Sequence, residues 1–232
     1  INASNPCSEY MFLDDTACNL ASINLTKFYD LKTGKFDIEG YKHAIRVWTI
    51  VLEISVLMAQ FPSKEIAQLS FDFRTLGLGY ANLGAMLMRM GIPYDSPEGT
   101  QWCAALTAIL TGDAYATSAE MAKELGPFPG YARNREHMLR VIRNHRRAAY
   151  GETVGYEGLS VLPVTLDHDN CPDAALLDAA HQAWDQALAV LGERADEESL
   201  RAVLGPDVDV TGALELIGDD DMVQRLDDQL VL

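Results

Sequence analysis

The sequence is poor in cysteine, in basic residues and in long apolar runs. Its 232 residues include only four cysteines, Cys7, Cys18, Cys103 and Cys171, without the close pairing of a zinc site or a disulfide scaffold. No stretch of about 18 apolar residues without charge occurs, which argues against a membrane-spanning helix. No basic start precedes an apolar core, so no signal peptide is expected. These absences predict a cytoplasmic protein with reduced thiols.

Basic residues are outnumbered, with 18 Lys and Arg against 34 Asp and Glu and a net charge of −16. This balance argues against nucleic acid or an anionic membrane as a partner. The charge is uneven, because residues 193–232 hold 12 acidic and 3 basic residues, whereas residues 133–147 hold six arginines. A solvated basic helix face is the more ordinary interpretation of the arginines, and phosphate binding is the alternative.

The length fits one large domain, and apolar and charged shares of 48% and 22% are those of a globular protein. The chain begins with Ile1 rather than Met, so we expect a processed chain or a piece of a longer one. The expected class is α/β and helix-rich. Two short strands, 10–13 and 20–25, come first, followed by helices over 37–61, 96–125, 135–147 and 172–191.

Residues 75–90 are apolar and are assigned to a helical region despite three internal glycines, Gly77, Gly79 and Gly84. Glycine disfavours helix, so the small residues indicate close packing against another backbone, most simply between helices. Their spacing does not fit a dinucleotide-binding fingerprint. The five histidines form no ligand spacing, and no metal site is expected.

The segment Asn5-Pro6-Cys7-Ser8-Glu9 alternates an amide, a thiol and a carboxylate. In an extended segment, Asn5, Cys7 and Glu9 project to the same side. The thiol can be a nucleophile, a hydrogen-atom donor or a buried filler, while the carboxylate can accept a proton and the amide can orient a hydroxyl. By spacing alone, a small buried cysteine is the more ordinary interpretation.

Cys18 follows Cys7 by eleven residues, beyond a tight turn. If strands 10–13 and 20–25 pair, the two thiols can face one cavity. This arrangement favours thiol redox chemistry over metal binding, because no third or fourth ligand lies nearby. The alternative is two unrelated core thiols, and Cys103 and Cys171 are interpreted as structural.

Residues 4–9 (SNPCSE) and 18–25 (CNLASINL) together resemble the active-site segment of ribonucleotide reductase catalytic subunits. The proline before Cys7 and the spacing to Cys18 are most similar to the class II, adenosylcobalamin-dependent enzymes. Residues 74–84, 118–128 and 140–145 are similar too. The resemblance extends over residues 1–191, and the acidic segment 192–232 is not matched to the family.

The resemblance implies a fragment of a ten-stranded α/β barrel, with a finger loop whose tip carries the radical cysteine. Cys7 would form the thiyl radical that removes the ribose 3′-hydrogen, and Glu9 would take the 3′-hydroxyl proton. Asn5 would bind the substrate hydroxyls, and Cys18 would be half of the reducing dithiol. The residues expected to contact substrate are Ser4, Asn5, Pro6, Cys7, Ser8 and Glu9.

The resemblance also implies partners: a ribonucleotide substrate, nucleotide effectors, an external dithiol reductant, the remainder of the reductase chain and a homodimer that uses part of residues 38–125. The cysteine that pairs with Cys18 and the phosphate-binding loop would lie outside these residues, so the chain alone is expected to be inactive. A class I large subunit, whose radical comes from a partner subunit, and a non-catalytic interaction fragment are the alternatives.

Overall fold

The computed structural model describes residues 2–5 and 10–191 of the chain. In chain order its elements are β1 (Ala3–Ser4), β2 (Met11–Phe12), β3 (Asn19–Asn24), η1 (Leu25–Lys27), β4 (Tyr29–Asp30), β5 (Lys35–Phe36), α1 (Ile38–Met58), α2 (Lys64–Phe73), β6 (Leu76–Ala81), α3 (Leu83–Met90), α4 (Pro97–Leu125), α5 (Tyr131–Ala149) and α6 (Ala174–Val190). The mixed content confirms the predicted α/β class.

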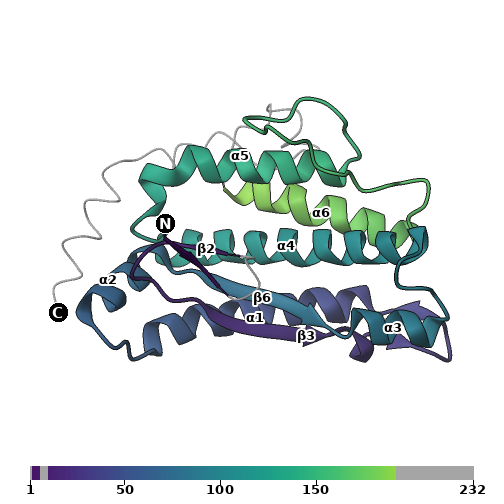
Figure 1. Ribbon diagram of the computed structural model, residues 1–232, viewed down its shortest axis with the longest axis horizontal. Helices are drawn as coiled ribbons and strands as arrows, with labels where there is room; N and C mark the ends of the chain where they lie inside the picture. The colour runs from purple at the N-terminus through teal and green to yellow at the C-terminus, as the bar shows by residue number, and fades with distance from the viewer. Residues whose placement is uncertain (1, 6–9, 192–232) are drawn as a thin grey trace.

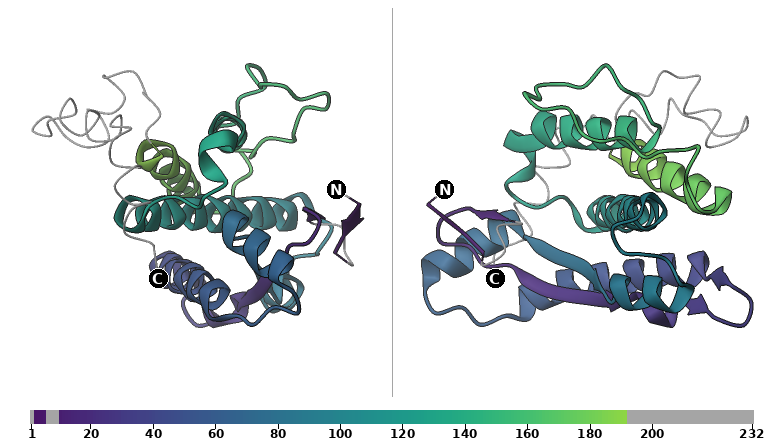
Figure 2. Two further views of the ribbon diagram at one scale, coloured as in Figure 1. Left: turned by 90° about the vertical axis from the view of Figure 1, so that its left-hand side faces the viewer. Right: turned by 45° about the vertical axis from the view of Figure 1, so that its right-hand side comes forward.

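The elements form layers around the long helix α4 (Figures 1 and 2). Helices α5 and α6 pack together, and α6 packs along α4 on one side. On the other side of α4 lies α1, which also packs on both strands of the β3–β6 sheet. Within the described residues, no helix is both long enough and apolar enough to span a membrane.

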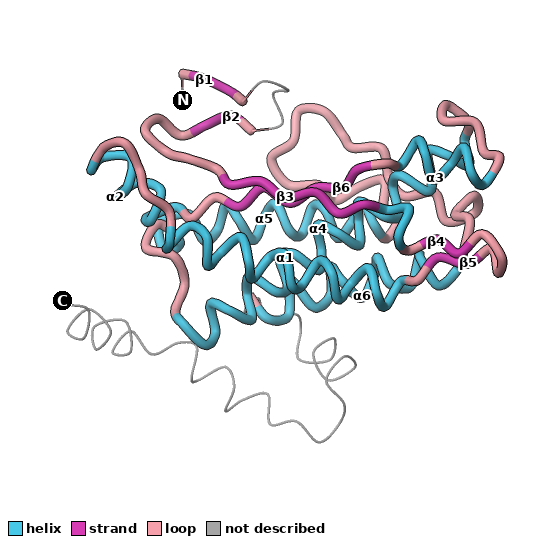
Figure 3. The backbone as a smooth tube through the Cα atoms, turned by 90° about the horizontal axis from the view of Figure 1, so that it is seen from below, coloured by secondary structure: helices cyan, strands magenta, loops and turns pink. Residues whose placement is uncertain are grey.

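The central sheet of the described residues is a parallel pair, β3 and β6, in register from Asn19 opposite Leu76 to Asn24 opposite Ala81 (Figure 3). β2 pairs instead with β1, and β4 pairs with β5. The conditional pairing of strand 10–13 with strand 20–25 is therefore wrong. Apolar alternation finds a strand but does not identify its neighbour, and here the neighbour of β3 lay in a segment assigned to helix.

The helical assignment of residues 75–90 is wrong in its first half. Residues 76–81 form β6, and only residues 83–90 are helical. Between them Asn82 adopts a left-handed conformation, with φ of 68°, and its Nδ2 donates to Asn24 Oδ1 at 3.0 Å. Asparagine tolerates this conformation better than most residues, so the strand turns directly into α3.

The long helices begin and end close to the predicted positions. The Asp37 carboxylate accepts a hydrogen bond from the Gly40 amide at the start of α1, and the Ser96 hydroxyl accepts one from the Gly99 amide at the start of α4. α4 ends at Gly126 as predicted, and α6 matches its predicted range within two residues at each end. α5 extends beyond both predicted ends, and it packs on α6.

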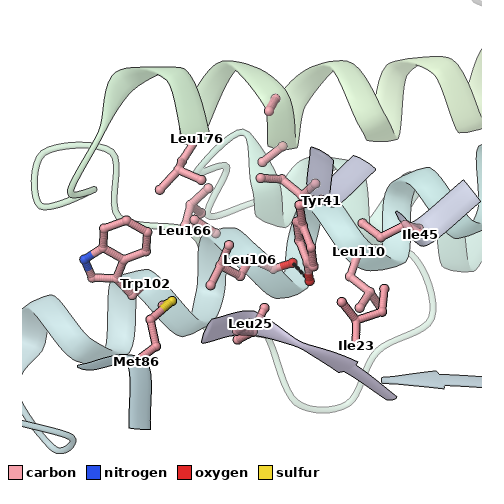
Figure 4. Packing of buried hydrophobic residues seen from close by; sticks show 14 of the residues in the cluster. Ile23, Leu25, Tyr41, Ile45, Met86, Trp102, Leu106, Leu110, Leu166 and Leu176 are labelled. Carbon is pink, nitrogen blue, oxygen red and sulfur yellow. Dashed lines mark hydrogen bonds between the residues drawn. The ribbon is translucent and has the colours of Figure 1, made fainter. Parts of the chain in front are cut away.

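One apolar core joins α1, α4, α6 and the β3–β6 sheet (Figure 4). Tyr41 on α1 is fully buried there, and its hydroxyl donates to the Leu106 carbonyl on α4 at 3.3 Å. The core residues labelled in the figure are Ile23, Leu25, Tyr41, Ile45, Met86, Trp102, Leu106, Leu110, Leu166 and Leu176. Because β3 contributes Ile23 to this core, the position of the strand is tied to the helices.

Candidate functional site

Asn5 and Tyr10, the two described residues nearest to Cys7 in the chain, bond to each other. Asn5 and Tyr10 bond twice: the Asn5 amide N–H donates to the Tyr10 carbonyl at 3.3 Å, and the Tyr10 amide N–H donates to Asn5 Oδ1 at 3.0 Å. Both residues are half-buried. With Asn5 Oδ1 engaged in this way, the amide nitrogen of the same side chain is the group that remains to donate to a ligand.

Tyr10 also links the paired strands β1 and β2 to the β3–β6 sheet. Its hydroxyl lies 3.1 Å from the Thr75 hydroxyl, directly before β6. Leu76, the next residue, stands opposite Asn19 in the parallel register, and Cys18 directly precedes Asn19. The segment flanking Cys7 is therefore anchored at the same end of the sheet, the amino-terminal end, at which Cys18 lies.

The backbone around Cys18 is fixed on both sides. The Ala17 amide donates to the hydroxyl of Ser70 at 3.1 Å, and Ser70, on α2, is almost completely buried. Asn19 donates from Nδ2 to the Leu52 carbonyl on α1 at 2.7 Å and also bonds to the Ser55 hydroxyl. These contacts hold the start of β3 against two helices.

The Cys18 thiol is half-buried and lies on the face of β3 opposite to Asn19. Its Sγ is 3.6 Å from the Asn19 carbonyl oxygen, within reach of a weak S–H hydrogen bond. The described residues contain Cys18, Cys103 and Cys171 as thiols rather than disulfides. A reduced thiol on a fixed backbone can form a disulfide with a second thiol brought to it, when an acceptor takes two electrons and two protons from the pair.

The predicted site residues divide between those that are described and those that are not. Ser4 is exposed, and its hydroxyl donates to the Asn5 carbonyl at 3.1 Å. Asn5 and Cys18 occupy the places given above. The described residues do not include Pro6, Cys7, Ser8 and Glu9. The common orientation predicted for Asn5, Cys7 and Glu9 is therefore not tested and stays a prediction.

Three contributors to this site were missed by sequence reasoning: Tyr10, Ser70 and Thr75. Each of them has a hydroxyl that meets a residue far away in the chain: Tyr10 and Thr75 meet each other, and Ser70 meets Ala17. No local pattern marks such a hydroxyl, because its function depends on the tertiary contact alone. Gly77 was noticed, but for packing between helices rather than for its place beside Cys18.

Three arginines in the second half of α5 are paired with acids outside that helix. Arg143 makes two hydrogen bonds to the Glu157 carboxylate, at 2.9 and 2.7 Å, and Arg147 makes a third at 2.9 Å. These bonds, with that from Arg143 first, lower the pKa of Glu157 to about 2. Arg146 binds Asp185 on α6 at 2.6 Å. These contacts favour the structural interpretation of the three arginines over phosphate binding.

Among residues 2–5 and 10–191, no group of three or more His, Cys, Asp or Glu side chains is arranged to hold a metal ion. The donor groups at the amino-terminal end of the sheet are an amide, hydroxyls and a thiol. The fold and this site together define an α/β domain that carries a half-buried thiol at the amino-terminal end of a parallel sheet.

Comparison with known proteins gives that domain a family. Residues 1–199 match the family described as ribonucleotide reductase, barrel domain. The chain is 61% identical over 221 residues to the vitamin B12-dependent ribonucleotide reductase of Bradyrhizobium diazoefficiens, which covers 95% of this chain and 17% of that protein. The corresponding enzyme of Agrobacterium fabrum is 60% identical over 221 residues, with the same two shares. That of Rhodopirellula baltica is 45% identical over 222 residues, covering 95% of this chain and 19% of that protein.

The chain belongs to the ribonucleotide reductase barrel domain family. The resemblance inferred from residues 4–9 and 18–25 is therefore confirmed. The chain spans less than a fifth of the length of these curated relatives.

Proposed function

We propose that this chain forms part of the catalytic barrel of a class II ribonucleotide reductase, which converts ribonucleotides to deoxyribonucleotides by radical chemistry. The observation that carries the proposal is the position of Tyr10, which directly follows segment 6–9 in the chain. The Tyr10 hydroxyl lies 3.1 Å from the Thr75 hydroxyl, beside the strand end that bears Cys18. A radical cysteine and a reducing cysteine acting on one substrate need this proximity.

In the proposed reaction, a thiyl radical on Cys7 removes the ribose 3′-hydrogen as a hydrogen atom. Glu9 accepts the 3′-hydroxyl proton and later returns it. The 2′-hydroxyl takes one proton of the dithiol and leaves as water, and the other hydrogen of the dithiol, with the two electrons, goes to C2′. Asn5 donates from Nδ2 to a substrate hydroxyl, because its Oδ1 is engaged by the Tyr10 amide. The 3′-hydrogen then returns to the sugar and restores the Cys7 radical. Ser4, Pro6 and Ser8 complete the proposed substrate contacts.

The two electrons of the reduction come from a dithiol. Cys18 supplies one thiol, and the other belongs to a cysteine outside these 232 residues. The pair loses two electrons and two protons and becomes a disulfide, which an external dithiol reductant returns to the thiol state. The fixed backbone of Ala17 and Asn19 keeps Cys18 in place through this cycle.

Adenosylcobalamin is the proposed radical source, because the relatives are named vitamin B12-dependent. This cofactor supplies a carbon-centred radical when its cobalt–carbon bond breaks. The groups described beside Cys18 are hydroxyls, an amide and a thiol. We assign no contact of the cofactor to them.

The β3–β6 sheet is proposed to be one part of a ten-stranded barrel that other parts of a longer chain complete. Residues 1–191 are proposed to be a fragment of this barrel, and residues 192–232 a separate acidic segment. Both outer edges of a two-stranded parallel sheet need partners, and parallel sheets are normally covered on both faces. The proposed partners are the ribonucleotide, nucleotide effectors, the dithiol reductant and a second copy of the assembled enzyme.

Two alternatives make different predictions. A class I large subunit would take its radical from a partner subunit and would not require cobalamin; the names of the relatives favour class II. A non-catalytic interaction fragment would use the barrel helices as a binding surface and would not depend on Cys7.

The test is a chimera in which the 221 aligned residues replace their counterpart in the Bradyrhizobium diazoefficiens relative. We expect deoxyribonucleotide formation from ribonucleotides that depends on added adenosylcobalamin and a dithiol. Replacing the radical-forming sulfur in Cys7→Ser should abolish turnover, a loss of at least about 1000-fold, because a hydroxyl cannot take the role of the thiyl radical.

Cys171→Ser is the matched control, since Cys171 lies in a loop and bonds only weakly to the Asp173 carbonyl, at 3.6 Å. Its turnover should stay within about twofold of the parent, because Cys171 is half-buried in a loop and has no proposed part in the reaction. Full activity of Cys7→Ser would overturn the proposal. Turnover without cobalamin would favour the class I alternative.

A further inference from the structure

The β3–β6 sheet has one face turned to helix and one face that carries the thiol. Asn19 bonds to the Leu52 carbonyl on α1, so the face of Asn19 is the helix-covered one. Residues two apart share a face, which places Cys18 and Leu20 on the other side. In the parallel register Leu20 stands beside Gly77. Leu20 is 72% exposed, so this face is open among the described residues.

Gly77 lies directly against the Cys18 thiol. A Cβ atom added to Gly77 would stand 3.0 Å from Cys18 Sγ, 3.0 Å from the Asn19 carbonyl oxygen and 2.3 Å from Leu20 Cδ2. The first two contacts are closer than ordinary van der Waals distance, and the third is a collision. Any side chain at this position must therefore displace the thiol, the leucine or both.

Gly77 is not needed for an unusual backbone conformation. Gly77 is absent from the glycines with positive φ, so its backbone is one that alanine can adopt. The position instead requires the absence of a side chain, because the Cys18 thiol and the Leu20 side chain occupy the space that a Cβ would take. Gly79, two residues along the same strand and on the same face, is the contrast, because a Cβ added there meets nothing within 4 Å.

We propose that Gly77 is a positioning residue for Cys18: the bare backbone of β6 lets the thiol lie against the strand and points it toward its partner sulfur. The inference rests on the proposed function, in which Cys18 is half of the reducing dithiol. Disulfide formation tolerates little error, with an S–S bond of about 2.05 Å and a Cβ–Cβ separation of roughly 3.5–4.5 Å. A side chain at Gly77 moves Sγ away from that geometry without removing the thiol.

The experiment compares Gly77→Ala with Gly79→Ala in the chimera described above. The first readout is the rate at which iodoacetamide alkylates Cys18, followed by mass spectrometry of its peptide. The second is the amount of deoxyribonucleotide that the pre-reduced enzyme forms per chain without added reductant, which depends on the dithiol. A merely structural defect would lower protein yield but would not selectively change Cys18 alkylation.

We expect Gly77→Ala to change the alkylation rate of Cys18 at least about threefold and to lower the single-turnover yield at least about fivefold, because the thiol is displaced. Gly79→Ala should leave both within about 1.5-fold, as for an unobstructed position. If Gly77→Ala kept the parent's Cys18 alkylation rate and single-turnover yield, the inference would be overturned.

The double variant Gly77→Ala/Leu20→Ala separates the two collisions and guards against misfolding. It removes the 2.3 Å contact and leaves the 3.0 Å contact with Sγ. If the thiol is the displaced group, the double variant folds and keeps the altered alkylation rate, relative to Leu20→Ala alone. Restoration of the Leu20→Ala value would mean that Gly77 serves only Leu20, and the inference would fall. An inactive parent chimera would instead refute the proposed function, while the alkylation comparison would still judge Gly77.

Discussion

The ring of Tyr150 stacks on the ring of His181, with centroids 4.0 Å apart and planes inclined by 9°. The Tyr150 hydroxyl donates to Asp185 at 2.6 Å, and Arg146 donates to the same carboxylate at 2.6 Å. The His181 Nε2 bonds to the Ala149 carbonyl at 3.1 Å. Since Tyr150 caps α5 and His181 lies on α6, this cluster joins the two helices.

The first prediction concerns the pH dependence of the α5–α6 contact. Burial lowers the pKa of His181, with His168 adding to the effect and the Ala149 carbonyl opposing it. The unfolded chain therefore binds this proton more readily, so the contact is fully stable above the usual value of about 6.5 and weakens as pH falls below it. Hydrogen exchange of α6 peptides in the chimera, corrected for intrinsic rates, should show faster opening at pH 5.5 than at pH 7.5.

His181→Gln should flatten that pH dependence while it keeps a side-chain donor. The matched control is His43→Gln on α1, which is far from the α5–α6 contact in sequence and belongs to a different helix. An unchanged pH dependence in His181→Gln would show that another group controls it.

The second prediction concerns Asp113, a buried acid on α4 whose Oδ2 has no hydrogen-bond partner within the described residues. Burial raises the pKa of Asp113 to about 6, against the opposing effect of Lys42. The folded state holds the proton more tightly, so stability rises as pH falls through about 6 and is lowest above it. Asp113→Leu, which keeps the number of heavy atoms, should stabilise α4 by about 1–3 kcal/mol at pH 7.

Protection of α4 peptides in hydrogen exchange measures this change. The gain should shrink at pH 4.5, where the carboxyl group of the parent is neutral. A gain that is equal at both pH values would mean that packing, rather than charge burial, is responsible.

The third prediction concerns the loop over residues 151–169. Glu157 binds Arg143 and Arg147, and its backbone N–H and C=O both bond to the Asn144 side chain, at 2.9 Å each. Glu157→Gln should loosen the loop by about 1 kcal/mol, a modest value because the carboxylate is partly exposed. Limited proteolysis between residues 151 and 165 should become faster.

Glu152→Gln is the control, since Glu152 is more exposed and lies 3.8 Å from Arg147. The pKa of Glu157 is lowered to about 2, so its contribution is present above about 4.5 and is lost as pH falls toward 2. Equal proteolysis of the two variants would contradict the assignment.

The fourth prediction concerns the crossing of α4 and α6. A Cβ added to Gly112 would lie 2.7 Å from the Ala183 Cβ and 3.0 Å from its carbonyl carbon. Glycine to alanine within a helix normally stabilises by about 1 kcal/mol, but here the collision should reverse the sign and destabilise by about 1–3 kcal/mol. Exchange of α4 and α6 peptides should accelerate together. A stabilised Gly112→Ala would show that the helices can separate at no cost.

Local signals made much of this fold predictable. Asp37, Ser96 and Gly126 mark helix ends through groups that act within a few residues, and the structure confirms each of them. β6 was not predictable in the same way, because Gly77 and Gly79 carry no strand propensity and are accommodated only by the facing strand.

The candidate site also has features that depend on neighbouring residues and features that depend on tertiary contacts. The alternation of Asn5, Cys7 and Glu9 is visible in neighbouring residues, and their common orientation stays a prediction. The neighbour of Cys18 was not predictable from nearby residues, because β3 pairs with β6 rather than with strand 10–13. The anchors Ser70 and Thr75 were not predictable either, since each meets a partner more than fifty residues away. The active-site assignments of Cys7 and Glu9 stay predictions that depend on family resemblance.

The parallel pairing of β3 with β6 closes a long loop of chain that contains the β4–β5 hairpin, α1 and α2. Closing such a loop costs entropy, and the packing of α1 on both strands offsets it. The free energy that keeps Cys18 beside Gly77 therefore comes in part from a helix on the opposite face of the sheet. A substitution in the buried face of α1 will alter how often the thiol is in place, although it changes no atom near the sulfur.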